Sequence, residues 1–149
     1  MTAEPRPARA EDIPRIEALI TGEHLPAYGL DEFLETFVVL ADGEHIVGCA
    51  GLEVYGEAAL LRSVVVAPER RRKEEGRRLV EAALSEARRR GVARVYLFTM
   101  NAGVFFGRLG FREVEPEEFE EAVRASRQFE AVSRIPDLRV RIKAMALEL

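Results

Sequence analysis

The sequence has few of the residues on which several classes of protein depend. It contains one cysteine, Cys49, two histidines and no tryptophan. A single cysteine excludes an internal disulfide, and two histidines do not make a credible zinc cluster, so no metal site is expected. The side-chain amides are limited to Asn101 and Gln128, whereas charged residues make up 32% of the chain. This balance predicts a thermophile, or otherwise heat-adapted, source.

Long apolar runs are also missing. Apolar runs such as Val64 to Ala67 fall far short of a membrane span, and the first twelve residues lack the apolar core of a signal peptide. We therefore expect a cytoplasmic protein without a membrane partner. The net charge of −4, with no aromatic residues among the cations, disfavours nucleic acid as a partner. At 149 residues, the chain is predicted to form one domain, 1–149.

The hydrophobic pattern changes its period along the chain. Apolar residues three and four positions apart predict helices, and β-rich runs between turn signals predict strands. The expected helices cover 12–20, 30–34, 76–90, 102–109 and 116–127, and the expected strands cover 37–41, 46–55, 59–66, 92–99, 111–114 and 139–147, the last as an edge strand. The order is about α-α-β-β-β-α-β-α-β-α-β. The sequence therefore predicts an α+β (α/β) fold with a mixed central sheet flanked by helices.

One segment combines features that bind anions. An apolar strand ends at Pro68, a basic run follows from Arg70 to Lys73, and a helix comes next. The start of a helix leaves several backbone N–H groups without partners in the helix, and these can bind a phosphate. The alternative is a solvated run of charge at a helix start.

Two motifs resemble those of the GNAT family of N-acetyltransferases. The first is similar to a Val-x-Pro strand end followed by an Arg/Gln-x-x-Gly-x-Gly/Ala loop, and the second to an aromatic-aromatic-x-Lys/Arg-x-Gly-Phe signature. The matching residues are Val66, Pro68, Arg71, Gly76 and Leu79, and then Phe105 to Phe111. The resemblance covers nearly the whole chain and is closest to amino-acid and arsenic-resistance-type N-acetyltransferases. It implies the GNAT fold and acetyl-CoA (coenzyme A) as cofactor.

The resemblance also implies where the cofactor binds. Backbone N–H groups of the 71–76 loop would hold the pyrophosphate, and a backbone N–H of the preceding strand, assigned to Val65, would contact the thioester oxygen. Asn101 would contact the pantetheine arm, although Asn is also a common helix N-cap. The full set of implied cofactor residues is Val64, Val65, Val66, Arg71, Arg72, Lys73, Glu74, Glu75, Gly76, Arg77, Asn101, Phe105 and Phe106.

The chain departs from the family pattern at three positions. Glu74 replaces the first loop glycine, and Arg72 stands where many relatives have another glycine. Side chains there are predicted to reshape the loop, and carboxylates beside a pyrophosphate to weaken binding unless they face solvent or are offset by nearby cations. Phe106 replaces a tyrosine that can protonate the leaving thiolate. Tyr96, Tyr55 or solvent would then supply that proton.

Four further residues are candidates for acceptor binding and catalysis. Glu53 is the predicted base or amine anchor, with a solvent-facing strand residue as the alternative. Arg62 or Ser63 is predicted to face the acceptor, because neighbouring strand residues point to opposite sides. An Arg62 guanidinium would bind a carboxylate, unless it forms a cross-strand salt bridge with Glu53. His24 lies in the loop that overhangs the substrate in the family, or is simply exposed.

Together these features predict transfer of an acetyl group from acetyl-CoA to the primary amine of a small acceptor, by direct attack in a ternary complex. An amino-acid-like acceptor is favoured by the resemblance and by Arg62. One alternative is a GNAT-fold acyl-CoA-binding or regulatory module that has lost turnover through the altered loop. Another is a structural subunit that forms a homodimer through its last strand or the 116–149 region.

Overall fold

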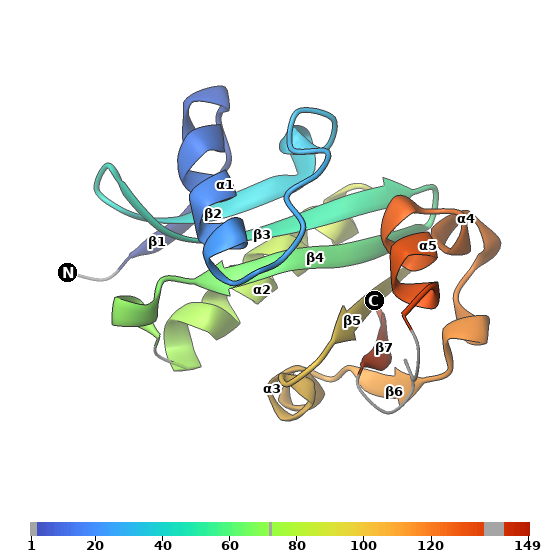
Figure 1. Cartoon of the computed structure of the whole chain (residues 1–149). Coiled ribbons are helices and arrows are strands. Elements are labelled where there is room, and N and C mark those ends of the chain that lie inside the picture. The colour runs from blue at the N-terminus through green and yellow to red at the C-terminus, as the bar shows by residue number, and fades with distance from the viewer. Residues whose placement is uncertain (1–2, 72, 136–141) are drawn as a thin grey trace. The chain divides into compact units, whose positions relative to one another are not determined.

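The computed structural model describes residues 3–71, 73–135 and 142–149. The chain contains both strands and helices, and the second, third and fourth strands follow one another without a helix between them (Figure 1). The strands are β1 (Glu4–Pro7), β2 (Phe37–Asp42), β3 (His45–Tyr55), β4 (Ala58–Val66), β5 (Arg94–Thr99), β6 (Arg112–Val114) and β7 (Lys143–Glu148). The helices are α1 (Ile13–Gly22), α2 (Lys73–Arg89), α3 (Gly103–Arg108), α4 (Glu121–Arg124) and α5 (Arg127–Ser133), with short 3-10 turns between them. None of these described helices is long and apolar enough to cross a membrane.

The strands form a mixed seven-stranded sheet in the order β1-β2-β3-β4-β5-β7-β6. The chain divides into two compact units, and β3 and β4 each contribute residues to both. The first unit comprises Met1–Glu53 and Leu61–Arg90, and the second comprises Val54–Leu60 and Gly91–Leu149. The predicted α+β class with a mixed sheet is confirmed.

In the first unit, β1, β2 and β3 pair in antiparallel register, and α2 packs against β2 and β1. The face of α2 that carries Leu79, Val80 and Ala83 is buried, as its apolar spacing predicts. Gly48 of β3 lies at a close approach to β4, because a Cβ there would be 2.9 Å from the carbonyl oxygen of Val65 and 3.4 Å from Leu79. Only glycine fits between β3 and β4 at this position.

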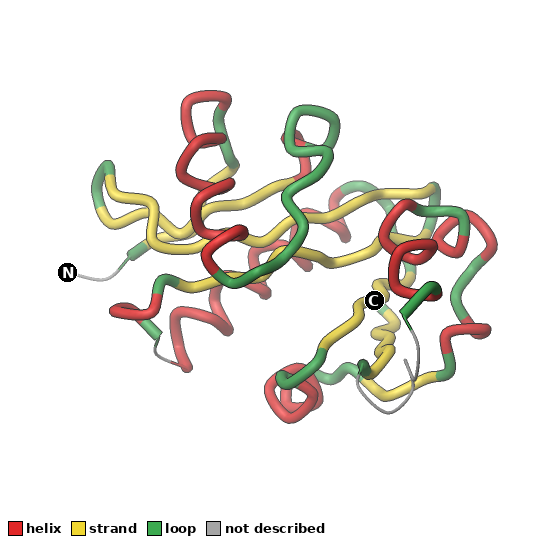
Figure 2. Tube along the Cα trace, in the orientation of Figure 1, coloured by secondary structure: helices red, strands yellow, loops and turns green. Residues whose placement is uncertain are grey.

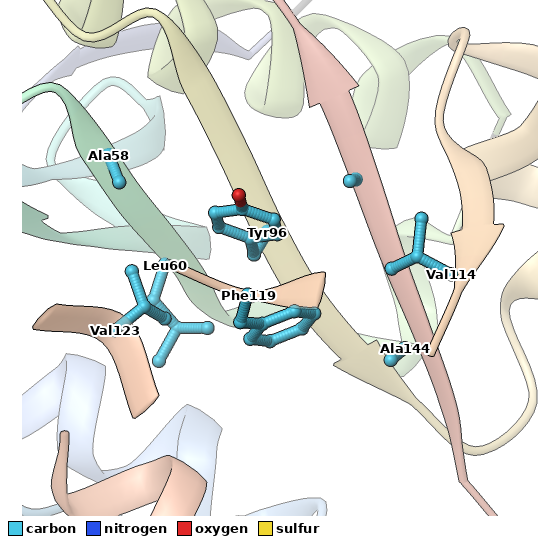
Figure 3. Close-up of a cluster of buried hydrophobic side chains, with 8 residues drawn as sticks. Ala58, Leu60, Tyr96, Val114, Phe119, Val123 and Ala144 are labelled. Atoms are coloured by element: carbon cyan, nitrogen blue, oxygen red, sulfur yellow. The ribbon is translucent and has the colours of Figure 1, made fainter. Parts of the chain in front are cut away.

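In the second unit, β4 residues Ala58 to Leu60 run parallel to β5, and β7 pairs antiparallel with both β5 and β6. The core of this unit is an apolar cluster around Tyr96 and Phe119 (Figure 3). The two rings lie 4.4 Å apart between centroids, and Phe129 packs 5.6 Å from Phe119. Gly91, with φ +78°, ends α2 where the sequence predicts a stop.

The structure differs from the sequence analysis at two places near the N-terminus. Strand β1 was not expected, because it contains Pro5 and Pro7; it lies at the edge of the sheet, where a strand tolerates missing N–H donors. The predicted helix at 30–34 is instead a series of turns that ends in a 3-10 turn, Leu34–Thr36, and Figure 2 shows a long loop here. Gly29 has φ +69°, and the carbonyls of Pro26 and Tyr28 bind Arg62, so this loop is held by tertiary contacts.

Two predictions near the C-terminus also need correction. The helix expected at 116–127 is divided into a 3-10 turn, Pro116–Glu118, and helices α4 and α5, because Ser126 caps α5 by accepting the Phe129 N–H at 3.2 Å. The predicted edge strand 139–147 is β7, which begins at Lys143 and lies between β5 and β6. The first part of that prediction, up to residue 141, lies outside the described residues.

Candidate active site

Strand β4 carries a backbone irregularity at the start of the segment that resembles the GNAT motif. Ser63 has φ +56°, a left-handed conformation that a non-glycine residue rarely adopts within a strand. The alternation of side chains along β4 is interrupted there, so Arg62 and Ser63 do not point to opposite sides. Instead the Arg62 Nε donates to the Ser63 Oγ at 3.0 Å. The two side chains are therefore bonded to each other.

After Ser63, successive backbone N–H groups of β4 again point to opposite sides of the strand. Their bonding partners show which of them face away from β3. The Ala67 N–H donates to the Val47 carbonyl at 2.7 Å, and the Val65 N–H faces the sulfur of Cys49, so both are used on the β3 side. The N–H groups of Val64 and Val66 therefore point the other way. The Val65 N–H, which was predicted to contact the thioester oxygen, is thus directed toward β3.

A buried arginine organises the loop before β2. The guanidinium of Arg62 donates to the Tyr28 carbonyl at 2.8 Å, to Glu53 Oε2 at 3.0 Å and to the Pro26 carbonyl at 3.1 Å. Its side chain is 2% exposed. The Tyr28 ring lies 4.0 Å from the guanidinium carbon, which adds a cation–π contact. Arg62 therefore ties the loop to β3 and β4.

These contacts decide between the alternatives for Arg62 and Glu53. The salt bridge to Glu53 exists, and four of the five guanidinium N–H groups are used by the protein, so a bidentate grip on an acceptor carboxylate does not fit. The solvent-facing alternative for Glu53 is wrong, because the residue is 1% exposed. His24, with φ +60°, is exposed near the start of the same loop.

Tyr28 belongs to this group and was missed from the sequence. Its hydroxyl donates to Glu53 Oε2 at 3.0 Å, and the residue is half-buried. The available signal was its place between Pro26 and Gly29, an aromatic residue in a loop of turn formers. That signal does not reveal a partner 25 positions away.

At the start of α2, the carboxylates of Glu74 and Glu75 have different surroundings. The Glu74 side chain is 71% exposed and pairs with Arg77 at 3.0 Å. Glu75 is buried, and Arg70 binds it at 3.2 Å while also binding Asp42 at 2.6 Å. The Arg70 guanidinium holds the pKa of the Asp42 carboxyl below its usual range. The Glu74 carboxylate thus faces solvent, and the charge of Glu75 is offset by Arg70.

The loop and α2 start therefore fit the pyrophosphate that the resemblance implies. Helix α2 begins at Lys73, so its first-turn N–H groups, those of Lys73, Glu74 and Glu75, have no partner within the helix. Arg71 anchors the loop, because its Nε donates to the Val66 carbonyl at 3.1 Å and its Nη2 binds Glu23 at 2.7 Å. Arg72 lies outside the described residues.

In the second unit, the predicted residues occupy different environments. Phe106 is buried, with its ring 5.0 Å from Phe105 and 5.6 Å from Phe111, so it serves as core. Asn101 is exposed and is not the N-cap of α3, because Thr99 Oγ1 accepts the Ala102 N–H at 3.0 Å. Tyr96 is buried, its hydroxyl bonds to Glu120 at 3.3 Å, and burial raises its pKa.

Comparison with known proteins identifies the family. The model of the GNAT acetyltransferase domain matches residues 34–113. An uncharacterized N-acetyltransferase of Chlorobaculum tepidum is 33% identical over 123 residues, which is 79% of each chain. An amino-acid acetyltransferase of Neisseria meningitidis is 28% identical over 128 residues, and the match covers 80% of this chain but only 29% of that protein.

A solved structure agrees with this identification. A Mycobacterium tuberculosis protein in complex with CoA superposes with a TM-score of 0.82 at 26% identity, covering 97% of this chain and 98% of that one. The family, fold class and cofactor predicted from the sequence are thereby confirmed. The chain belongs to the GNAT family and is an acetyl-CoA-dependent N-acetyltransferase.

Proposed function

We propose that the enzyme acetylates the primary amine of a small, amino-acid-like acceptor by direct attack in a ternary complex. The observation that carries the acyl-transfer part is the kink at Ser63, followed by a strand end and the first turn of α2. The acceptor class is supported by the similarity to an amino-acid acetyltransferase over 80% of this chain. Homodimer formation is a separate expectation, and this proposal does not need it.

Residues of the first unit would bind the cofactor and polarise its thioester. Acetyl-CoA supplies a thioester whose carbonyl carbon is open to attack by an amine. The first-turn N–H groups of α2, with Arg71, would hold the pyrophosphate. The Val64 N–H would donate to the carbonyl oxygen as negative charge develops there. Because Phe106 has no proton to give and Tyr96 is bonded within the core, solvent would protonate the departing sulfur.

The acceptor would be held by the loop that Arg62 fixes. Tyr28, which is half-buried in this loop and donates its hydroxyl proton to Glu53, would contact the bound amine. Glu53 would then anchor the amine through Tyr28. The Ser63 hydroxyl accepts from Arg62 and keeps its own proton for an acceptor carboxylate oxygen, and exposed His24 would add a contact at the loop start.

An acceptor panel tests the substrate class. Thiol release from acetyl-CoA would be followed with free amino acids, polyamines and peptides with free N-termini, and products would be identified by mass spectrometry. We expect turnover with one or more free amino acids and none with their N-acetylated forms, which lack the nucleophile. Turnover confined to polyamines or peptides would contradict the acceptor class.

Initial-rate kinetics test the mechanism. Direct attack in a ternary complex gives intersecting double-reciprocal lines, whereas a covalent acetyl-enzyme gives parallel lines. Calorimetric titration with acetyl-CoA separates the enzyme from the alternative of a binding module. Binding without thiol release across the whole panel would favour the module.

A further inference from the structure

The conformation of Ser63 is one that its neighbours must maintain. A serine at φ +56° has a backbone cost that glycine would not have, and such a residue persists only when surrounding groups determine its geometry. The sequence offers no glycine here to remove that cost. Two side chains contact Ser63, one at its hydroxyl and one at its carbonyl.

The first contact comes from Arg62. Its Nε donates to the Ser63 Oγ at 3.0 Å, and the rest of the guanidinium is held by Glu53 and by the carbonyls of Pro26 and Tyr28. A side chain that is 2% exposed and bonded at all three nitrogens has little freedom to move. Arg62 therefore presents its Nε to Ser63 in a fixed direction.

The second contact comes from Cys49 of β3. Its thiol donates to the Ser63 carbonyl at 3.3 Å, and the Val65 N–H faces the same sulfur. Cys49 is fully buried, and burial raises the pKa of the thiol to about 12, so the donor proton is kept at physiological pH. The sulfur thus bonds to β4 on both sides of Val64. Neither alanine nor valine at this position could do so.

These two contacts fix the strand on either side of the N–H that matters for catalysis. With the Ser63 carbonyl and the Val65 N–H both directed to Cys49, the intervening Val64 N–H is directed away from β3. We propose that Arg62 and Cys49 are positioning residues that together clamp Ser63 in its left-handed conformation and so aim the Val64 N–H. The catalytic part of this inference rests on the function proposed above.

Substitution of Cys49 tests the clamp through turnover. Cys49→Ala and Cys49→Val remove both sulfur contacts, the second while keeping the side-chain volume, and Cys49→Ser restores a donor and acceptor. We expect kcat to fall between about tenfold and a hundredfold in the Ala and Val variants, with KM for acetyl-CoA changed less than about twofold. Cys49→Ser should recover most of the loss. Ile16→Val, a buried change in α1, is the control for general destabilisation.

Backbone NMR tests the same clamp without any need for turnover. Cys49→Ala should shift the amide resonances of Ser63 to Val66, alter the coupling constant that reports the φ of Ser63, and speed hydrogen exchange at the Val65 N–H. Cys49→Ser should reverse these changes, and Ile16→Val should not produce them. Unchanged resonances across Ser63 to Val66 would overturn the clamp.

The two measurements separate this inference from the proposed function. If wild-type enzyme releases no thiol with any acceptor, the proposed function fails while the NMR comparison still decides the clamp. If turnover is seen but Cys49→Val has the kcat of wild type, the positioning role is wrong even where Ser63 shifts. Equal losses in Cys49→Ser and Cys49→Val would also contradict it, because volume rather than hydrogen bonding would then be responsible.

Discussion

Two arginine–glutamate ion pairs in the first unit have the same length and opposite surroundings. Arg62 and Glu53 are 3.0 Å apart with side chains 2% and 1% exposed, and Arg77 and Glu74 are 3.0 Å apart with side chains 53% and 71% exposed. An unpaired charge is costly in a buried site and nearly harmless in water. Distance alone therefore says little about what an ion pair does.

The difference bears directly on the altered cofactor loop. Glu74 replaces a family glycine, yet its carboxylate faces solvent and Arg77 offsets its charge. It also lies in the first turn of α2, where a negative charge is favourable for the helix dipole. By contrast, Arg62 was expected to face the acceptor and is an internal support. We therefore expect Glu74 to have little effect on cofactor binding, and Arg62 to be critical for stability.

The largest predicted effect is at Arg62. Arg62→Met keeps most of the side-chain volume but leaves Glu53 buried without its cation, so the free energy of unfolding should fall by about 3–5 kcal/mol. Arg77→Met, the matched change in the exposed pair, should cost less than about 0.5 kcal/mol. Urea unfolding at neutral pH measures both. Similar losses of unfolding free energy in the two variants would show that burial does not distinguish the two ion pairs.

Tyr28→Phe should have the next largest effect. It removes the hydroxyl that donates to Glu53, a hydrogen bond to a charged group, and should lower the free energy of unfolding by about 1.5–2 kcal/mol. If Tyr28 contacts the amine, KM for the acceptor should also rise, with KM for acetyl-CoA unchanged.

Tyr96→Phe is the matched control for loss of a hydroxyl. Its bond to Glu120 is longer, at 3.3 Å, and lies in the second unit. We expect a smaller stability loss and no change in kcat. A large fall in kcat for Tyr96→Phe would revive the prediction that this residue supplies the proton to the leaving group.

The sequence predicted much of the fold because its elements are marked by local chemistry. Gly91 ends α2, and the apolar face of α2 predicts its burial. The strand before the cofactor loop and the helix after it were placed by Pro68 and by the motif resemblance. Strand β1 was missed because its two prolines argue against a strand in any position except an edge.

The details of the site were less predictable, for physical reasons. The left-handed conformation of Ser63 depends on Arg62 and on Cys49. Because Cys49 belongs to another strand, no local sequence pattern marks the kink. That kink determines which valine N–H faces away from β3, and the sequence alone does not show it. Arg62 was predicted either to bind the acceptor or to pair with Glu53, and the sequence does not specify the path of the loop that places Pro26 and Tyr28 against it.

A third prediction concerns pH and a partly exposed ion pair. Asp12 accepts from Arg6 at 2.8 and 3.1 Å and from the Arg9 N–H at 2.8 Å, and the Arg6 bond holds its pKa below the usual range. A lowered folded-state pKa means that the carboxylate stabilises the fold above the ordinary Asp pKa, and that this contribution is lost as pH falls through the lowered value.

Asp12→Asn should therefore be less stable than wild type at neutral pH, by about 1 kcal/mol. The gap should close progressively as pH falls below the ordinary Asp pKa of about 4, because the wild-type carboxylate then becomes protonated. Urea unfolding of both proteins across this range gives the comparison. A gap that stays constant with pH would mean that the charge of Asp12 is not what stabilises the fold.

The smallest effect is expected at the residue that first raised doubt about the loop. Glu74→Gly restores the family glycine, and Glu74→Gln removes only the charge. Because the wild-type carboxylate faces solvent and is paired with Arg77, both variants should bind CoA within about twofold of wild type by calorimetry, the difference expected when an exposed pair is lost. Glu75→Gln, which loosens the buried contact with Arg70, should instead lower stability. If Glu74→Gly bound CoA tenfold more tightly than wild type, the Glu74 carboxylate would be weakening the binding of the pyrophosphate. Its exposure to solvent would then not be enough to prevent that effect.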